Sequence, residues 1–120
     1  MGNALAAAAR VREAEARTGI RPIESYSSNG QLEVKGGTKE GKLHGPYESY
    51  HKNGQLWKKA TYTAGELDGP FESHHENGQL MWKGPYDMGV KCGEWIQPGL
   101  FWGQKTLTYD PCPPGLEDGN

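Results

Sequence analysis

The tetrapeptide Asn-Gly-Gln-Leu occurs three times in the sequence, at Asn29–Leu32, Asn53–Leu56 and Asn77–Leu80. Both spacings are 24 residues. A fixed period of this length is typical of chains that stack one supersecondary unit on itself. Units of this kind bury their apolar faces only against their neighbours, so repeat folds are elongated and expose long surfaces. We therefore expect a protein that binds rather than one that catalyses.

The similarity between the copies extends beyond the tetrapeptide in both directions. Pro22–Tyr26 recurs as Pro46–Tyr50 and as Pro70–His74, and a diverged last copy is Glu94–Gln97. Glycines also recur at two repeat positions. The first position holds Gly41, Gly65 and Gly89, and the second holds Gly45, Gly69 and Gly93. Because residues 22–97 align without a gap, the whole range is predicted to be one repeat array.

Each repeat is predicted to be a β-hairpin. In the second repeat, runs at Pro46–His51 and Gln55–Tyr62 flank Asn53-Gly54. Asn-Gly is the strongest short hairpin signal, because a type I′ turn needs positive φ at both central residues. A second reversal is expected at Gly65–Gly69, where two glycines bracket the turn. These elements predict a mainly β protein, a single-layer antiparallel meander of stacked hairpins.

The turn type decides the register of each hairpin. A two-residue turn places Tyr47 opposite Ala60, whereas a three-residue loop with a glycine bulge would place Tyr50 level with Leu56. We favour the first, because it sets a large residue against a small one in all three repeats. It gives one face an apolar ladder, namely Ile23, Tyr47, Phe71 and Trp95, with Leu32, Leu56 and Leu80. It gives the other face opposed charges, namely Glu24, Glu48 and Glu72 with Lys35, Lys59 and Lys83.

The segments outside the repeats divide the chain further. Alanine-rich Ala4–Arg17 is predicted to be a helix that stops at Gly19 and docks on the sheet or on a partner. The division is an N-terminal helix (1–19), three hairpin repeats with the start of a fourth (20–97), a diverged final hairpin (98–110) and a disordered tail (111–120). The final hairpin is expected to turn around Gly103-Gln104.

Composition excludes several classes of partner. The net charge of −2 predicts no electrostatic attraction to nucleic acid or to an anionic membrane. No apolar run approaches the roughly 20 residues that a membrane-spanning helix needs. Cys92 and Cys112 form no framework of the secreted kind, and we expect reduced thiols in a cytoplasmic protein.

No constellation of residues predicts catalysis, a cofactor or a metal site. His44, Asp68 and Cys92 share one repeat position, but equivalent positions of neighbouring hairpins lie about 9.6 Å apart, two strand spacings. Zinc ligands lie roughly 2.0–2.3 Å from a single ion, so such rungs cannot share one. The strand serines also recur at one repeat position and are predicted to be structural. No phosphate-binding loop and no dinucleotide fingerprint occurs.

Large apolar residues that depart from the period are the candidate partner-binding residues. Trp57, Met81 and Trp82 stand where other repeats carry charged or smaller side chains. The two-residue register puts Trp57 and Met81 on the face of the Glu–Lys pairs, where they would form a contact patch. Packing against the helix or the last hairpin is the alternative. Trp102, outside the repeats, is a further candidate.

The repeat unit resembles the MORN-repeat variant. Its best copy here is Tyr50–Leu56, followed by Tyr62, Gly65 and Gly69-Pro70-Phe71. The resemblance covers residues 22–97, about two-thirds of the chain. It implies hairpins that stack into a twisted antiparallel meander, and a role in scaffolding and protein–protein interaction. Many bacterial proteins of the variant type are antitoxin-like, and the resemblance implies the same class for this chain.

The residues and the resemblance together predict a non-enzymatic module that binds a protein partner of unknown identity. Its most concrete form is an antitoxin-like or inhibitor protein that occludes an effector, such as a phage-type inhibitor of host defence. One alternative is a self-associating scaffold, including a homodimer through open sheet edges. Another is a carbohydrate- or cell-wall-binding protein whose aromatic ladder stacks on sugars.

Overall fold

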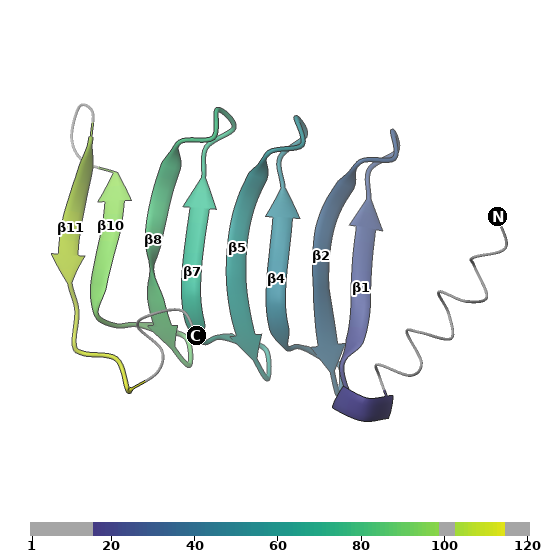
Figure 1. The fold of residues 1–120 in the computed structure, drawn as a ribbon, viewed down its shortest axis with the longest axis horizontal. Coiled ribbons are helices and arrows are strands. Elements are labelled where there is room, and N and C mark those ends of the chain that lie inside the picture. The colour runs from purple at the N-terminus through teal and green to yellow at the C-terminus, as the bar shows by residue number, and fades with distance from the viewer. Residues whose placement is uncertain (1–15, 99–102, 115–120) are drawn as a thin grey trace, which may run out of the picture.

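The computed structural model describes residues 16–98 and 103–114. These residues form one antiparallel sheet, in which the long strands lie side by side in chain order (Figure 1). The long strands are β1 (Arg21–Tyr26), β2 (Leu32–Lys39), β4 (Gly45–Tyr50), β5 (Leu56–Thr63), β7 (Gly69–His74), β8 (Leu80–Asp87), β10 (Glu94–Pro98) and β11 (Gln104–Thr108). Two-residue strands pair with the ends of β2, β5 and β8, and these are β3 (Lys42–Leu43), β6 (Glu66–Leu67) and β9 (Val90–Lys91). The predicted fold class, a mainly β antiparallel meander, is confirmed.

Only the end of the predicted N-terminal helix falls within the described residues. Residues 16–18 are helical, and Gly19 follows with a φ of 73°, as a helix-terminating glycine does. The rest of the predicted helix, residues 4–15, lies outside the described residues.

The Asn-Gly segments form turns of a different type from the one predicted. Gly54 has a φ of 88°, but Asn53 is not among the residues with positive φ, which excludes type I′. The N–H of Gly54 donates to the carbonyl of His51 at 2.9 Å. The side-chain oxygen of Asn53 accepts the N–H of Gln55 at 3.0 Å, and the other two repeats repeat this contact. Each loop is therefore a three-residue turn with a left-handed glycine, closed by an asparagine side chain.

Type I′ turns occur at the opposite end of the hairpins. Both central residues have positive φ at Glu40-Gly41, Ala64-Gly65 and Met88-Gly89. In the second unit, the N–H of Gly65 ties the turn to the carbonyl of Leu43 at 2.8 Å. Because a non-glycine residue in the left-handed region costs about 1–2 kcal/mol, such hydrogen bonds help to hold the turns.

The predicted register is confirmed over most of each hairpin. Tyr47 pairs with Ala60, and Glu48 pairs with Lys59. The first and third hairpins show the same pairs one period away. Large residues therefore face small ones on one side of the sheet, and acids face bases on the other.

A β-bulge near each Asn-Gly turn moves the repeat leucines to the other face. The register shifts between Ser49 and Tyr50. Tyr50 then pairs with Leu56, and Trp57 becomes the extra residue. Directly opposed residues share a face, and Tyr50 shares its face with Glu48, whose carboxylate accepts the tyrosine hydroxyl at 2.8 Å. Leu56 therefore lies on the Glu–Lys face, and its predicted place in the aromatic ladder is wrong.

The buried core lies on the aromatic face, where the leading ring of each unit covers a small residue of the preceding unit. Trp95 is 1% exposed and meets Tyr86 edge to face, with ring centroids 5.0 Å apart. It lies directly against Gly84. Nearer the other end of the array, Tyr47 lies against Gly36 in the same way. This packing seats each hairpin on the one before it.

The final hairpin begins earlier than predicted. β10 pairs with β11 along its whole length, from Glu94 opposite Thr108 to Pro98 opposite Gln104. The predicted boundary at residue 98 therefore divides a single hairpin. The physical reason is that β10, which repeats the first strand of the earlier hairpins, would otherwise have an unpaired edge. β11 pairs with that edge.

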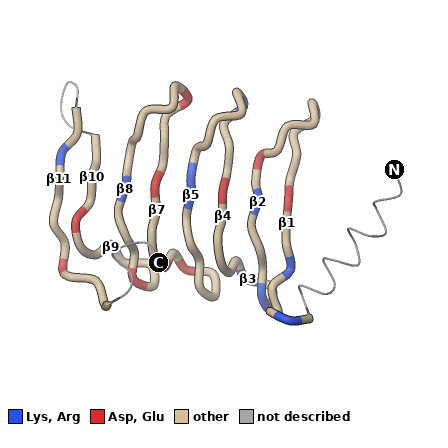
Figure 2. Tube along the Cα trace, in the orientation of Figure 1, with Lys and Arg blue, Asp and Glu red and all other residues tan. Residues whose placement is uncertain are grey.

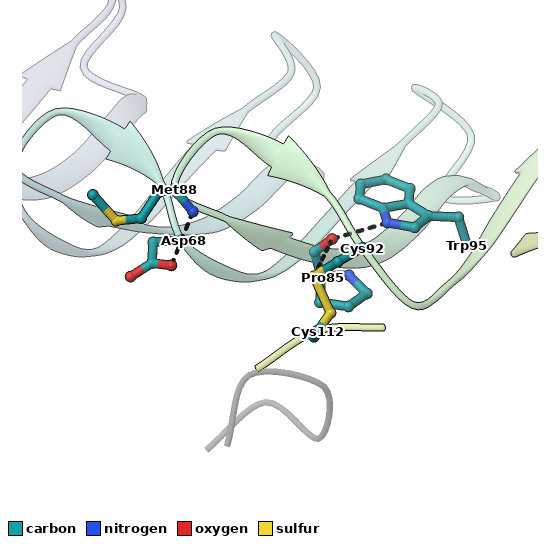
Figure 3. The surroundings of a disulfide bond; sticks show 6 residues. All are labelled: Asp68, Pro85, Met88, Cys92, Trp95 and Cys112. Atoms are coloured by element: carbon teal, nitrogen blue, oxygen red, sulfur yellow. Dashed lines mark hydrogen bonds between the residues drawn. A yellow bond between two sulfur atoms is a disulfide. The ribbon is translucent and has the colours of Figure 1, made fainter. Parts of the chain in front are cut away.

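The two cysteines form a disulfide, which corrects the expectation of reduced thiols (Figure 3). The bond joins Cys92, just before β10, to Cys112, beyond β11, and both residues are buried. The N–H of Gly93 also donates to the carbonyl of Asp110 at 2.8 Å. The start of the predicted disordered tail, residues 111–114, is therefore tied to the sheet, while residues 115–120 lie outside the described residues.

Candidate functional site

The Glu–Lys face holds a shallow trough that crosses the strands from β4 to β11. Its volume is about 750 Å³. The uncharged residues that line it include Pro46, Thr61, Pro70, Pro85, Ile96 and Thr106. The charged residues that line it are Glu48, Lys59, Glu72, Lys83 and Glu94. The trough therefore combines rigid apolar surface with charges of both signs.

Charges of alternating sign cross this face in one line, here called the charge row. Its members are Glu24, Lys35, Glu48, Lys59, Glu72 and Lys83, each directly opposite the next. The alternation runs across β1 to β8 at mid-strand in Figure 2. Because neighbouring strands lie about 4.8 Å apart, charges of like sign are about 9.6 Å apart. The row is electrically neutral but strongly patterned.

The lysines of the charge row are available for contacts with a partner. Within the described part of the chain, none of them has a carboxylate within 4.0 Å. Two of the three acids are engaged locally. The Nε2 of His74 lies 3.0 Å from the carboxylate of Glu72. Likewise, the hydrogen bond from Tyr50 to Glu48 is the main cause of the raised pKa of that tyrosine. The trough thus presents ammonium groups without close counter-charges.

Trp57 and Met81 occupy equivalent positions in neighbouring hairpins, as the extra residues of the bulges. Trp57 is 41% exposed and stacks on His51, with ring centroids 5.3 Å apart. The ammonium of Lys58 lies 4.7 Å from the same ring. Met81 is half-buried. These two predicted contact residues therefore sit at the Asn-Gly end of the sheet, and neither lines the trough.

Trp82 belongs to a different cluster on the aromatic face. It lies opposite Ser73, and the ammonium of Lys91 lies 4.5 Å from its ring centroid. The same ammonium lies 4.7 Å from Trp95 and 5.7 Å from Tyr109. Three rings thus surround one cation.

The sequence analysis did not identify Lys91 as a candidate. The signal was present, because Lys91 stands at a repeat position where the two preceding repeats have leucine. Trp102, the fourth candidate, lies outside the described residues.

The repeat position that invited a metal hypothesis has structural uses. His44 and Asp68 each accept a backbone N–H from a type I′ turn, and Cys92 is in the disulfide. Residues 16–98 and 103–114 contain no group of three or more potential metal ligands. In the same ranges, no helix has the length and apolar character needed to cross a membrane.

The fold defines a hairpin-repeat protein with an extended face that holds the trough. The model of the MORN repeat variant family matches residues 43–64 and 67–88. The second and third hairpin units are therefore MORN repeats of the variant type, and the resemblance seen in the sequence is confirmed there. MORN repeats are interaction repeats, and enzymes are not typical of the family. Comparisons with curated proteins and with solved structures gave no match.

Proposed function

We propose that this chain is a non-enzymatic module that binds a protein partner across the trough. In its more specific form, it acts as an antitoxin-like inhibitor that occludes the surface of an effector protein. The observation that carries the proposal is the charge row, which lines the trough with Lys59 and Lys83 and leaves both without a close carboxylate among the described residues. The two matched interaction repeats support a binding role.

The alternation of the charge row indicates the kind of partner. Glu48, Lys59 and Glu72 follow one another at about 4.8 Å across the strands, and one turn of an α-helix advances about 5.4 Å. A helix that crosses the strands with one charge per turn, alternating in sign, would therefore meet one opposite charge per strand. A shift by one strand would bring like charges together, so the pattern favours specificity over raw affinity.

The aromatic face does not support the carbohydrate alternative. Trp95 is fully buried. Tyr47 and Tyr62 meet edge to face with centroids 5.4 Å apart, and Phe71 and Tyr86 do so at 5.5 Å. A sugar needs a free ring face on which to stack, and these rings are packed against one another instead.

Self-association is the second candidate function, because β1 is an edge strand of the sheet that residues 16–98 and 103–114 form. It is the first strand in the sheet order, and five of its six residues are exposed. An edge of this kind has backbone N–H and C=O groups that can pair with a strand of another copy.

Capture of a partner by the purified, tagged chain tests the binding role. The informative variant combines Glu72→Lys with Lys83→Glu, which reverses two members of the charge row at constant net charge. The matched control combines Glu76→Lys with Lys105→Glu, two exposed residues that do not line the trough. We expect a protein identified by mass spectrometry to be captured by the wild type and the control and lost with the trough variant. Equal capture by all three would remove the trough as the binding surface.

A second measurement tests the inhibitory role. The activity of the captured protein is assayed with and without one equivalent of the chain, and we expect inhibition by the wild type but not by the trough variant. A captured enzyme that keeps its full activity contradicts the inhibitor proposal while leaving the binding role intact. If the wild type captures nothing and its mass in light scattering grows with concentration, the scaffold function replaces both.

A further inference from the structure

Each central hairpin unit is closed by a contact between the residue before its first strand and a turn residue that follows its second strand. In the second unit, Nδ1 of His44 accepts the N–H of Ala64 at 3.3 Å. In the third, Oδ1 of Asp68 accepts the N–H of Met88 at 3.1 Å (Figure 3). These closing contacts hold the two ends of each unit together.

The disulfide is the closing contact of the fourth unit. Cys92 follows Asp68 by 24 residues, and Cys112 follows Met88 by 24 residues. The separation across the bond is 20 residues, as it is in the hydrogen-bonded pair of the third unit. A covalent bond thus stands where the preceding units use a hydrogen bond.

The fourth unit has a shorter backbone ladder to its neighbour than the other units, and it lacks a turn hydrogen bond that they have. In the described part of the sheet, β10 pairs with β8 only between Ile96 and Lys83, whereas the β2–β4 and β5–β7 junctions each have two paired positions. Gly89 ties the third turn to the carbonyl of Leu67. One period later stands Pro113, which has no N–H to donate. At its closing position the fourth unit therefore has the disulfide in place of the two turn hydrogen bonds. It also keeps a hydrogen bond from the indole N–H of Trp95 to the carbonyl of Pro85 at 2.9 Å and one from the N–H of Gly93 to the carbonyl of Asp110 at 2.8 Å.

We propose that the Cys92–Cys112 bond is a redox-controlled lock on the fourth hairpin unit. When oxidised, it holds β10 and β11 against the array. A thiol or dithiol reductant supplies two electrons and two protons, so that the S–S bond breaks, both cysteines become thiols and the reductant becomes a disulfide. The second and third units keep their hydrogen-bonded closing contacts, so reduction opens the fourth unit alone.

Opening uncovers a surface that the closed form hides. β8 loses the strand on its outer side, and its backbone groups around Lys83 become an edge to which a strand of a partner can add. Trp95 leaves Gly84 and becomes exposed to solvent. Opening also removes the end of the trough that Glu94, Ile96 and Thr106 line. The exchange experiment below measures only the protection of backbone amides, so its outcome does not depend on whether the trough binds a partner.

Hydrogen–deuterium exchange of the full chain, oxidised and after treatment with dithiothreitol, tests the lock. We expect reduction to speed exchange of the β10 and β11 amides by roughly a hundredfold, the effect of releasing a cross-link of this span. Amides of β4, β5 and β7 should exchange at unchanged rates. Alkylation of two thiols, detected by mass spectrometry, verifies that the bond was reduced.

Two variants separate the lock from a general loss of stability. Cys92→Asp with Cys112→Met copies the Asp68–Met88 pair, and it should keep β10 and β11 protected with or without reductant. Cys92→Ser with Cys112→Ser should exchange as the reduced wild type does. Unchanged β10–β11 exchange in fully alkylatable wild type overturns the lock. Loss of protection along the whole sheet overturns it as well, because the bond would then stabilise the chain globally.

Discussion

The indole ring of Trp95 lies so close to Gly84 that a Cβ built on this glycine would be 2.3 Å from the ring. Tyr47 covers Gly36 in the same way, but there the Cβ would be 3.1 Å from the ring edge. Contacts below 3.0 Å force a displacement of one partner. Trp95 is buried within the array, whereas Tyr47 is half-buried and freer to move.

Gly84→Ala is therefore expected to destabilise the chain by about 1–3 kcal/mol, the usual cost of overpacking a core. For a domain somewhat larger than about 100 residues, each kcal/mol lowers the melting temperature by several degrees. Urea unfolding followed by tryptophan fluorescence measures the loss. Gly36→Ala is the matched control and should cost clearly less. Equal losses for the two variants would contradict the role assigned to the Trp95 ring.

The period in the sequence predicts these ring contacts better than it predicts the turns. The pairing of Tyr47 with Ala60 follows from large and small residues alternating in every repeat. The turn at Asn53 does not, because asparagine suits both a type I′ turn and a turn closed by its own side chain. Once the three-residue loop forms, Trp57 becomes a bulge and Leu56 changes face, as any one-residue slip requires.

Ser73→Ala is expected to stabilise the chain by about 1 kcal/mol. The Ser73 hydroxyl is buried and has no hydrogen-bond partner among the described residues, and an unsatisfied buried group costs roughly 1–3 kcal/mol. Ser25 occupies the same repeat position in an exposed strand, so Ser25→Ala serves as the control and should change stability little. A loss of stability in Ser73→Ala would show that the hydroxyl has a partner, such as a bound water.

Ala64→Asn is expected to raise stability by about 0.5–1 kcal/mol. Ala64 has a φ of 50° at the first central position of a type I′ turn, where asparagine is preferred and alanine is strained. Its N–H, which bonds His44, is unaffected by the substitution. Met88→Asn, one period later with a φ of 46°, should act in the same direction. A decrease in the denaturation midpoint for both variants is incompatible with the turn geometry.

The candidate site was less predictable than the fold, because it depends on contacts between hairpins. The pairing of Glu48 with Lys59 follows from the register, but its continuation from Lys59 to Glu72 is a junction between units. The disulfide could have been inferred from the 24-residue period, had the contact of Asp68 with the following turn been known. That contact is tertiary and leaves no local pattern in the sequence.

Alkaline pH is expected to destabilise the chain through Tyr86 and Tyr62. Burial is the main cause that raises the pKa of both side chains above the ordinary value, with nearby tyrosines as a smaller cause. Because the folded pKa exceeds the unfolded one, the stability contributed by these residues is fully present below pH about 10 and is lost as the pH rises through the folded pKa. Urea unfolding at several pH values should therefore show a midpoint that falls above pH about 10. Tyr86→Phe should flatten this fall, and Tyr26→Phe, at an exposed residue, controls for removal of a hydroxyl. A midpoint that falls equally steeply in Tyr86→Phe and in the wild type would show that Tyr86 does not contribute to the alkaline transition.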